Sequence, residues 1–139
     1  MAVLGTRALT LSVGGTDYTA VVTNCRITAG AADSDITTFL DAASGGAREY
    51  KLEFTAIQDP ATATLWNTMF TAPGTSVAVI VKPAGGTTAS PTQPHFTGNV
   101  IVSEPDGDIL GGEANASSTA RFTFDCAWTF TAKPVRVTA

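Results

Sequence analysis

The sequence predicts a mainly β protein, a two-sheet β-sandwich or half-closed barrel with one short flanking α-helix. Two observations predict the sheets: long segments in which apolar and polar residues alternate, and turn residues between those segments. A third observation, apolar residues at helical spacing within about residues 59–71, predicts the helix. A chain of 139 residues has the length of one domain, so residues 1–139 are treated as a single unit.

The segment from residue 121 to residue 130 has the clearest strand pattern. A period of two over ten residues is typical of a strand with one buried face. Residues 49–57 repeat the pattern, with charged residues between the apolar ones. Both segments therefore predict long strands whose second face is polar. The alternating apolar residues are Phe122, Phe124, Cys126, Trp128 and Phe130 in the first segment, and Tyr50, Leu52 and Phe54 in the second.

Shorter strands are expected elsewhere along the chain. Residues 8–13 and 16–18 flank Gly14-Gly15, a pair that tolerates the positive φ of a tight hairpin turn. Residues 77–81 are apolar at every position, which predicts a strand covered on both faces. The remaining expected strands are residues 20–28, 35–40, 76–82 and 96–103.

The predicted helix has recognisable start and stop signals. Asp59 suits the N-cap and Pro60 suits the first helical position. Four apolar residues then form one stripe, which we expect to face the sheets, and Pro73-Gly74 ends the helix. Packing on the sheets explains this stripe without a ligand. Its members are Leu65, Trp66, Met69 and Phe70.

The chain carries few charges for a protein that meets water on all sides. Hydrophobic residues make up 44% of the chain and charged residues 14%, whereas an average soluble protein has roughly 25% charged residues. Charge is depleted at the centres of protein interfaces. The composition therefore predicts a surface that contacts other protein, with a sparsely charged but otherwise ordinary β domain as the alternative. The net charge of −4 and the absence of a basic run argue against tight binding to nucleic-acid phosphates.

The residues needed for catalysis are scarce, and we expect no enzyme activity. His95 is the only histidine, so any catalytic triad would have to use it, and no nucleophile-elbow motif lies nearby. The carboxylates Glu104, Asp106, Asp108 and Glu113 lie in one Gly- and Pro-rich loop. No glycine-rich phosphate-binding motif occurs, so no cofactor is expected.

Metal sites and disulfides are equally weakly supported. Asp106-Gly107-Asp108 matches part of a calcium loop, but the other ligand positions are missing, which favours a solvated acidic loop. Cys25 and Cys126 lack metal-ligand spacing, and both fall on apolar strand faces, where they act as small buried hydrophobes. If their strands pair, the two thiols are expected to lie near one another.

Targeting signals are not evident. The apolar run at the start is too short for a signal peptide, and no stretch has the length of a membrane span. We therefore expect synthesis in a reducing cytoplasm, free thiols and no membrane contact.

The order of several segments is informative. An opening hairpin is followed by residues 35–39 (DITTF) and by a strand that closes on residues 52–60 (LEFTAIQDP). A helix with the pair Leu65-Trp66 comes next, then residues 74–83 (GTSVAVIVKP) and 91–100 (PTQPHFTGNV). A Gly-Gly loop and the last aromatic strand complete the succession. Over nearly its whole length, the chain in this order resembles the tail tube proteins of long-tailed, non-contractile bacteriophages.

The resemblance implies a structural virion protein made in the bacterial host cytoplasm. Family members form hexameric rings that stack into a tube, and one sheet of each subunit joins its neighbours around the lumen. DNA passes through the tube during ejection, and an acidic balance is expected to keep it from binding. The implied partners are further copies of the chain, a tape-measure protein, a terminator protein and baseplate proteins.

Loops are expected to carry the contacts between subunits. Residues 41–47 and 83–94 are the candidate contact loops, and residues 104–118 form a third long loop. A β-sandwich binding or adhesion module remains an alternative, as does another tail component such as a terminator or baseplate hub domain. The candidate contact residues are Asp41, Ser44, Gly45, Arg48, Pro83, Thr87, Pro91, Pro94 and His95.

Overall fold

The fold comes from a computed structural model, which describes residues 3–31, 36, 38–44 and 48–139. Strands dominate these residues, and the prediction of a mainly β fold with a short helix is confirmed. The strands are β1 (Thr10–Val13), β2 (Thr16–Asp17), β3 (Val22–Ala31), β4 (Arg48–Ile57), β5 (Ser76–Lys82), β6 (His95–Ile101), β7 (Thr123–Phe130) and β8 (Val135–Val137). The helices are α1 (Phe39–Ala43) and α2 (Leu65–Thr71).

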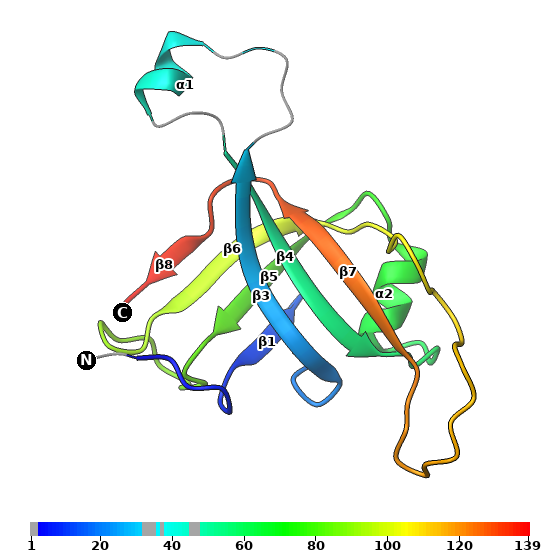
Figure 1. The fold of residues 1–139 in the computed structure, drawn as a ribbon. Helices are drawn as coiled ribbons and strands as arrows, with labels where there is room; N and C mark the ends of the chain where they lie inside the picture. Colours follow the sequence, from blue (N-terminus) through cyan, green and yellow to red (C-terminus); the bar gives the residue numbers. More distant parts are fainter. Residues whose placement is uncertain (1–2, 32–35, 37, 45–47) are drawn as a thin grey trace.

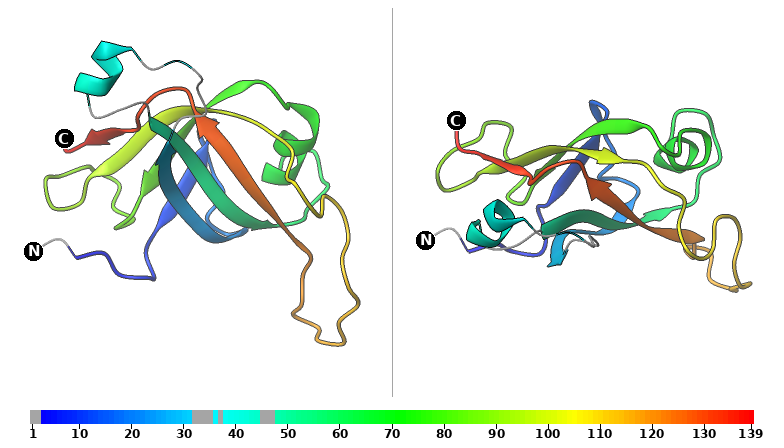
Figure 2. Two further views of the ribbon diagram at one scale, coloured as in Figure 1. Left: turned by 45° about the horizontal axis from the view of Figure 1, so that its top comes forward. Right: turned by 90° about the horizontal axis from the view of Figure 1, so that it is seen from above.

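All eight strands belong to one antiparallel sheet in the order β2-β1-β5-β6-β7-β4-β3, with β8 beside β6. The sheet bends into two layers that cross each other, β3-β4-β7 in one and β2-β1-β5-β6-β8 in the other (Figure 1; Figure 2). In the described residues, strand pairing joins the layers at two places only, Val100 opposite Phe130 and Ile101 opposite Thr129. The terminal strands β2 and β3 do not pair, so the sheet is a half-barrel and not a closed one.

The joint between the layers lies at one end of β6. The other end of β6 pairs with β8, through His95, Phe96 and Thr97. Because β6 changes its partner along its length, β7 and β8 separate from each other. In the other layer the joint lies at the Phe130 end of β7, opposite Lys51 near the start of β4, and the layers diverge beyond it towards β8. Helix α2 lies near the far ends of β4 and β7 (Figure 1).

The core fills the space between the layers. As the alternation predicts, the even-numbered residues of β4 from Leu52 and of β7 point inward and are buried. The ring of Phe54 packs edge-on against Trp128 and Phe124, with centroids 4.8 and 6.1 Å apart. The indole N–H of Trp128 donates to the carbonyl oxygen of Ser103 at 2.9 Å, which satisfies its polar atom. The core residues of β4 and β7 are Leu52, Phe54, Ala56, Phe124, Cys126, Trp128 and Phe130.

The expected strand over residues 35–40 is wrong in its described part, because Phe39 and Leu40 belong to helix α1 and neither residue 36 nor residue 38 is in a strand, while residues 35 and 37 lie outside the described residues. Thr38 caps this helix: its hydroxyl accepts from the Asp41 backbone N–H, and the Asp41 carboxylate accepts from the Thr38 backbone N–H, both at 3.1 Å. This reciprocal capping box satisfies two of the free donors at a helix start. Local capping, and not the alternating pattern, therefore determines that this segment is helical. The expected loop over residues 41–47 begins inside α1, and residues 45–47 lie outside the described residues.

The expected helix over residues 59–71 begins later, at Leu65. Its N-cap is Thr64, whose hydroxyl accepts from the Asn67 backbone N–H at 3.2 Å, and Asp59 instead accepts from Ala61 in a preceding turn. The apolar stripe is confirmed at its three buried members and wrong at Phe70, which is 51% exposed. The buried members are Leu65, Trp66 and Met69.

Two further expectations about strand faces need correction. β5 is covered on one face: Val79 and Val81 are buried, whereas Ala78 is exposed and Ile80 is half-buried. β7 begins at Thr123, so Phe122 lies outside the strand and is partly exposed. The apolar pattern identifies both strands. It does not show whether other parts of the chain pack on one face of the strand or on both.

Gly98 of β6 allows the two layers to approach closely. A Cβ atom placed on Gly98 would lie 2.9 Å from two ring carbons of Phe130, closer than a methyl group and an aromatic carbon can pack. The ring of Phe130 thus occupies the space that a side chain would need, next to the joint between β6 and β7.

We predict that Gly98→Ala lowers the free energy of unfolding by about 1–3 kcal/mol, because the added methyl group displaces the Phe130 ring. Gly30→Ala is the matched control, since a Cβ atom on Gly30 of β3 meets nothing within 4 Å. Urea unfolding followed by tryptophan fluorescence measures both variants. Equal stability of the two variants would contradict this account of Gly98.

Candidate functional site

The α1 segment projects from the body of the protein, beyond the ends of β3 and β4 (Figure 1). It presents two large apolar side chains to water: Phe39 is 97% exposed and Leu40 is 76% exposed. Neither side chain contributes to the core, so burial within this chain does not explain them. Exposed apolar side chains that lie together mark an interaction site.

Asp41 gives the same segment a negative charge. The backbone N–H of Thr38 donates to the Asp41 carboxylate, and with the Thr38 hydroxyl it holds the pKa of Asp41 below its ordinary value. The carboxylate is therefore ionised at neutral pH. Phe39, Leu40 and Asp41 are consecutive, so α1 combines two apolar side chains with one anion.

A groove of about 420 Å³ opens where the two layers diverge, at the end of β4 and β6 that lies away from α2. Ile27 and Tyr50 line it from one layer, and Val81 and Phe96 line it from the other. The groove has apolar walls because these positions continue the inward-facing rows of the core beyond the point where the layers touch. Its other lining residues are Leu4, Leu9, Cys25, Arg26, Pro83, Lys133 and Pro134.

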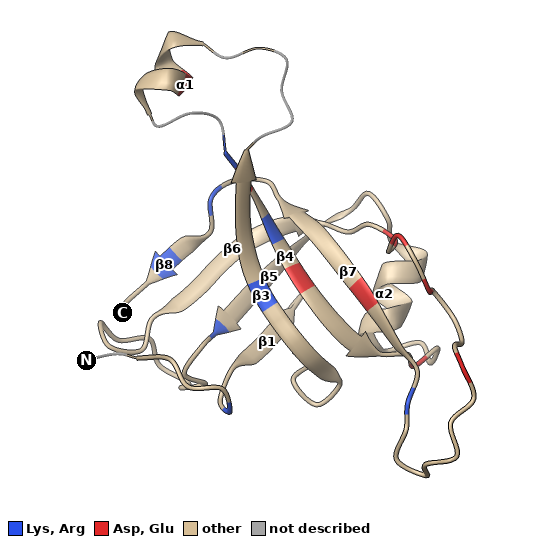
Figure 3. Ribbon diagram, viewed as in Figure 1, with Lys and Arg blue, Asp and Glu red and all other residues tan. Residues whose placement is uncertain are grey.

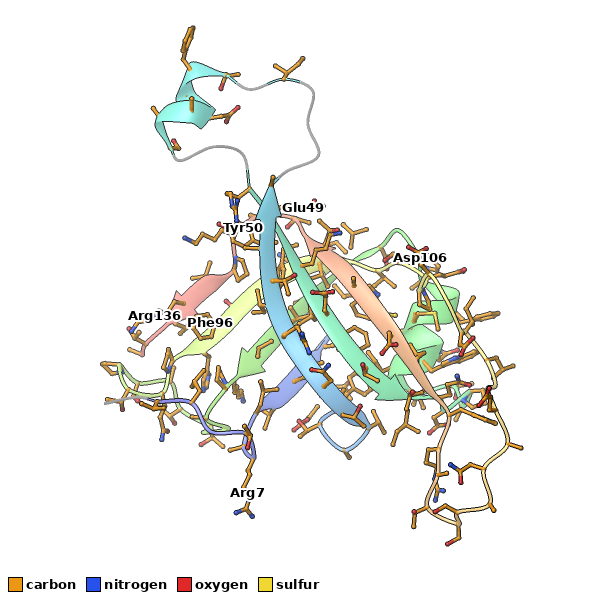
Figure 4. All side chains as sticks on the ribbon, viewed as in Figure 1. Arg7, Glu49, Tyr50, Phe96, Asp106 and Arg136 are labelled. Carbon is orange, nitrogen blue, oxygen red and sulfur yellow. The ribbon has the colours of Figure 1, made fainter. Side chains whose placement is uncertain are left out.

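The rim of the groove is basic. Lys133 is exposed and lies on its margin, and none of the described residues that line the groove is acidic. Arg136 of β8 pairs directly opposite Phe96 of β6, so it stands on the same face of the sheet, and Figure 4 shows the two residues close together. Figure 3 shows basic residues on β8 and before it, whereas acidic residues follow the β6–β7 connection on the other side of the molecule.

The opposite end of the molecule is closed by α2. Trp66 is buried, stacks on Phe70 at 4.9 Å between ring centroids, and donates its indole N–H to the carbonyl oxygen of Ile109 at 2.7 Å. The side chain of Gln58 donates to and accepts from the backbone of Gly111. These bonds hold the long connection between β6 and β7 against the body.

The predicted contact residues fall into two separate groups. Asp41 lies in α1, Ser44 is its C-cap, Arg48 begins β4 and Gly45 lies outside the described residues. The others lie at a distance from α1, in the β5–β6 connection beside the N-terminal segment (Figure 1). The second group comprises Pro83, Thr87, Pro91 and Pro94 in the connection, and His95 at the start of β6.

The β5–β6 connection is partly fixed to the body. His95 places Nε2 2.9 Å from the carbonyl oxygen of Gly86, and Gly85 with φ +73° lies against the backbone of Ala8. Only Pro83 of this group lines the apolar groove.

Sequence reasoning missed the groove and the apolar part of α1. Phe39 and Leu40 were assigned to a strand, and their exposure depends on α1 projecting into water. Tyr50 and Phe96 follow the inward-facing rows of their strands, a signal that predicts a core residue equally well. Only the divergence of the layers leaves them at the wall of a groove.

No metal site emerges from the part of the chain that the structure describes: it holds no cluster of three or more His, Cys, Asp or Glu side chains. Within the same residues, no helix has the length and apolar character that crossing a membrane requires.

The two cysteines do not come together, because β4 lies between their strands. Cys25 pairs opposite Phe54, and Phe54 pairs opposite Cys126. Two strand spacings put the Cα atoms about 10 Å apart, whereas a disulfide needs about 4.4–6.8 Å. Both thiols are free. Burial raises the pKa of Cys25 to about 11 and that of Cys126 to about 12.

Comparison with models of known protein families and with curated protein sequences found no match in either case.

We predict slow alkylation of both thiols by iodoacetamide at pH 8. The thiolate is the reactive form, and a raised pKa lowers its fraction at any pH below that pKa. The rate should therefore rise about tenfold per pH unit between pH 8 and 10, and Cys25 should react before Cys126. Mass spectrometry of the modified peptides measures the order and the rates.

Unfolded protein is the control for alkylation, because both thiols then react at the ordinary rate. Modification of Cys126 ahead of Cys25 in the folded protein would contradict the burial of the Cys126 side chain in the core between the layers.

Proposed function

We propose that this protein is a structural subunit that assembles with copies of itself into stacked rings, as the tail tube of a long-tailed, non-contractile bacteriophage. The observation that carries the proposal is the exposed surface of the chain, 8859 Å². A compact monomer of 14.2 kDa exposes about 6,800 Å². The excess of about 2,000 Å² is the scale of surface that one subunit buries against several neighbours, at about 800 Å² per partner.

The chemistry of this surface also suits contact with other protein. Charged residues make up 14% of the chain, and large apolar side chains are exposed on α1. The second face of β5, with Ala78 and Ile80, is apolar and incompletely covered. These features are costly in a solitary protein and are expected where a neighbour covers them.

The layer β3-β4-β7 supports joining into a ring. Within the described residues, β3 pairs only with β4, so the other edge of its ten residues is open. β7 pairs with β6 only at Thr129 and Phe130, but the rest of this edge is partly covered, because the Gln58 side-chain amide donates to the Thr123 carbonyl oxygen and the Ser103 hydroxyl donates to the Ala127 carbonyl oxygen. Open edges pair readily with other strands. The open edge of β3 therefore suits a contact with a different surface of a second copy, the head-to-tail kind of contact that closes into a ring.

The outer face of the same layer is polar and suits a water-filled lumen. Strand alternation and register place two cations on this face, Arg26 and Lys51. They also place three anions there, Glu49, Glu53 and Asp125. With three anions against two cations, this face offers DNA no net attraction. The proposal implies that DNA passes through the lumen without binding to this face. It also implies that the protein is located in the virion and that its partners include tape-measure, terminator and baseplate proteins.

A β-sandwich that binds glycans is the second candidate. Such modules present an exposed aromatic platform, but Trp66 and Trp128 are both buried, and Phe70 packs on Trp66. The exposed Phe39 and Phe122 lie in different segments and form no common platform. Another tail component, a terminator or a hub domain, shares the fold expectations and differs in whether it forms tubes.

Negative-stain microscopy of concentrated purified protein tests the proposal. We expect rings of uniform diameter, or tubes built from them, and sedimentation velocity should show a corresponding large species. A protein that stays monomeric at its highest soluble concentration, and that binds glycans on an array, would overturn the proposal in favour of the second candidate.

Fluorescence anisotropy with labelled double-stranded DNA tests the lumen. Weak binding that changes little with salt is expected from a face without net positive charge. Tight, salt-sensitive binding would contradict the passage of DNA without binding while leaving self-assembly standing.

A further inference from the structure

We propose that α1 of one copy inserts Phe39 and Leu40 into the apolar groove of a second copy, with Asp41 facing the basic rim formed by Lys133 and Arg136. This contact rests on the proposed self-assembly and names the two surfaces that meet. The structure motivates it by leaving both surfaces uncovered: Phe39 is almost fully exposed, so the α1 of a chain does not fill the groove of that chain.

The apolar parts match in character and size. An apolar cavity of about 150 Å³ accepts a benzene ring, so a groove of about 420 Å³ has room for the rings and methyl groups of a Phe and a Leu side chain. The walls are Ile27, Tyr50 and Phe96, with no acidic residue among the described lining residues. Transfer of both side chains from water into these walls favours docking.

The molecule already uses this kind of packing at its other end. There α2, a short helix, places Leu65 and Trp66 between the ends of the layers and closes the core. At the groove end, the described residues of the same chain supply no equivalent helix. A consecutive aromatic and leucine pair on α1 of a second copy would close that end in the same way.

The charges select the orientation of the contact. Asp41 is the only charged residue of α1, and it is ionised at neutral pH. Lys133 lines the groove and carries the opposite charge, and Arg136 adds a second positive charge next to the groove residue Phe96, which it pairs opposite. With the apolar pair inside the groove, Asp41 lies at the boundary with water, where a basic rim attracts it. An acidic rim would have repelled the same segment.

The contact is heterologous, because α1 and the groove are different surfaces of one chain. Repetition of a heterologous contact produces a closed ring or an open filament, in which each copy gives its α1 to one neighbour and receives α1 from another. The contact is therefore compatible with rings and does not limit the protein to dimers.

Photo-crosslinking identifies the receiving surface directly. Phe39 is replaced by p-benzoylphenylalanine, which keeps an aromatic ring at an exposed position, and ¹⁵N-labelled and unlabelled protein are mixed before assembly and irradiation. We expect crosslinks between labelled and unlabelled chains at groove residues such as Ile27, Phe96 or Pro134. Crosslinks within one chain, or to another surface of the second chain, would overturn the proposal.

Two pairs of variants measure the apolar and the charged parts of the contact by sedimentation velocity. Phe39→Ser should weaken self-association about tenfold or more, whereas Leu110→Ser, which removes an exposed apolar side chain from the acidic β6–β7 connection, should not. Lys133→Glu should weaken self-association roughly two- to five-fold. Arg121→Glu makes the same charge change in the β6–β7 connection and should leave self-association unchanged. All four positions are exposed, so the variants are expected to fold.

The outcomes separate this contact from the proposed function. Assembly that survives Phe39→Ser, or that is lost in Leu110→Ser instead, overturns the α1–groove contact and leaves the ring-forming subunit in place. A parent protein that remains monomeric overturns both.

Discussion

The change of partner along β6 is the constraint on which the rest of the structure depends. At one end β6 pairs with β7 through Val100 and Ile101, and at the other it pairs with β8. The layers are joined at the first end, where the Phe130 ring packs against Gly98, and α2 closes the core near the far end of β4. They diverge at the second end, and the inward-facing rows of the strands continue there as the walls of a groove. The change of partner from β7 to β8 along β6 thus fixes where the two layers join and where they separate.

The same asymmetry gives the protein surfaces of different character. The outer face of β3-β4-β7 is polar and is flanked by the open edge of β3, the groove is apolar with a basic residue on its margin, and α1 is apolar with a single anion. These surfaces complement one another and are not self-complementary. That is the property a subunit needs for head-to-tail assembly, since each contact then engages two different patches and leaves the next pair free. In the proposed assembly, the low charge of the chain reduces the cost of removing water from these patches.

Sequence patterns predicted the long strands well and the short helices poorly. β4 and β7 were correct nearly to the residue, because the alternation in each covers eight or more positions and few other structures match it. The alternation of residues 35–40 predicts a strand where α1 lies, whereas the decisive feature is the reciprocal capping of Thr38 and Asp41. The start of α2 was placed too early because Asp59 and Pro60 suit a helix start as well as they suit the turn in which they lie. Short-range signals of this kind compete at similar energies, and the surrounding packing selects between them.

The sequence by itself determined the mainly β class, the core faces of β4 and β7, the scarcity of charge and the presence of a single histidine. All of these depend on composition or on local periodicity, which a chain carries without reference to its fold. Only the tertiary structure decided that β4 separates Cys25 from Cys126, that Tyr50 and Phe96 line a groove and are not sealed inside the core, and that Phe39 stands in water. The physical reason is that alternation assigns each side chain to a face of its strand. The order of the strands and the divergence of the layers decide what that face meets.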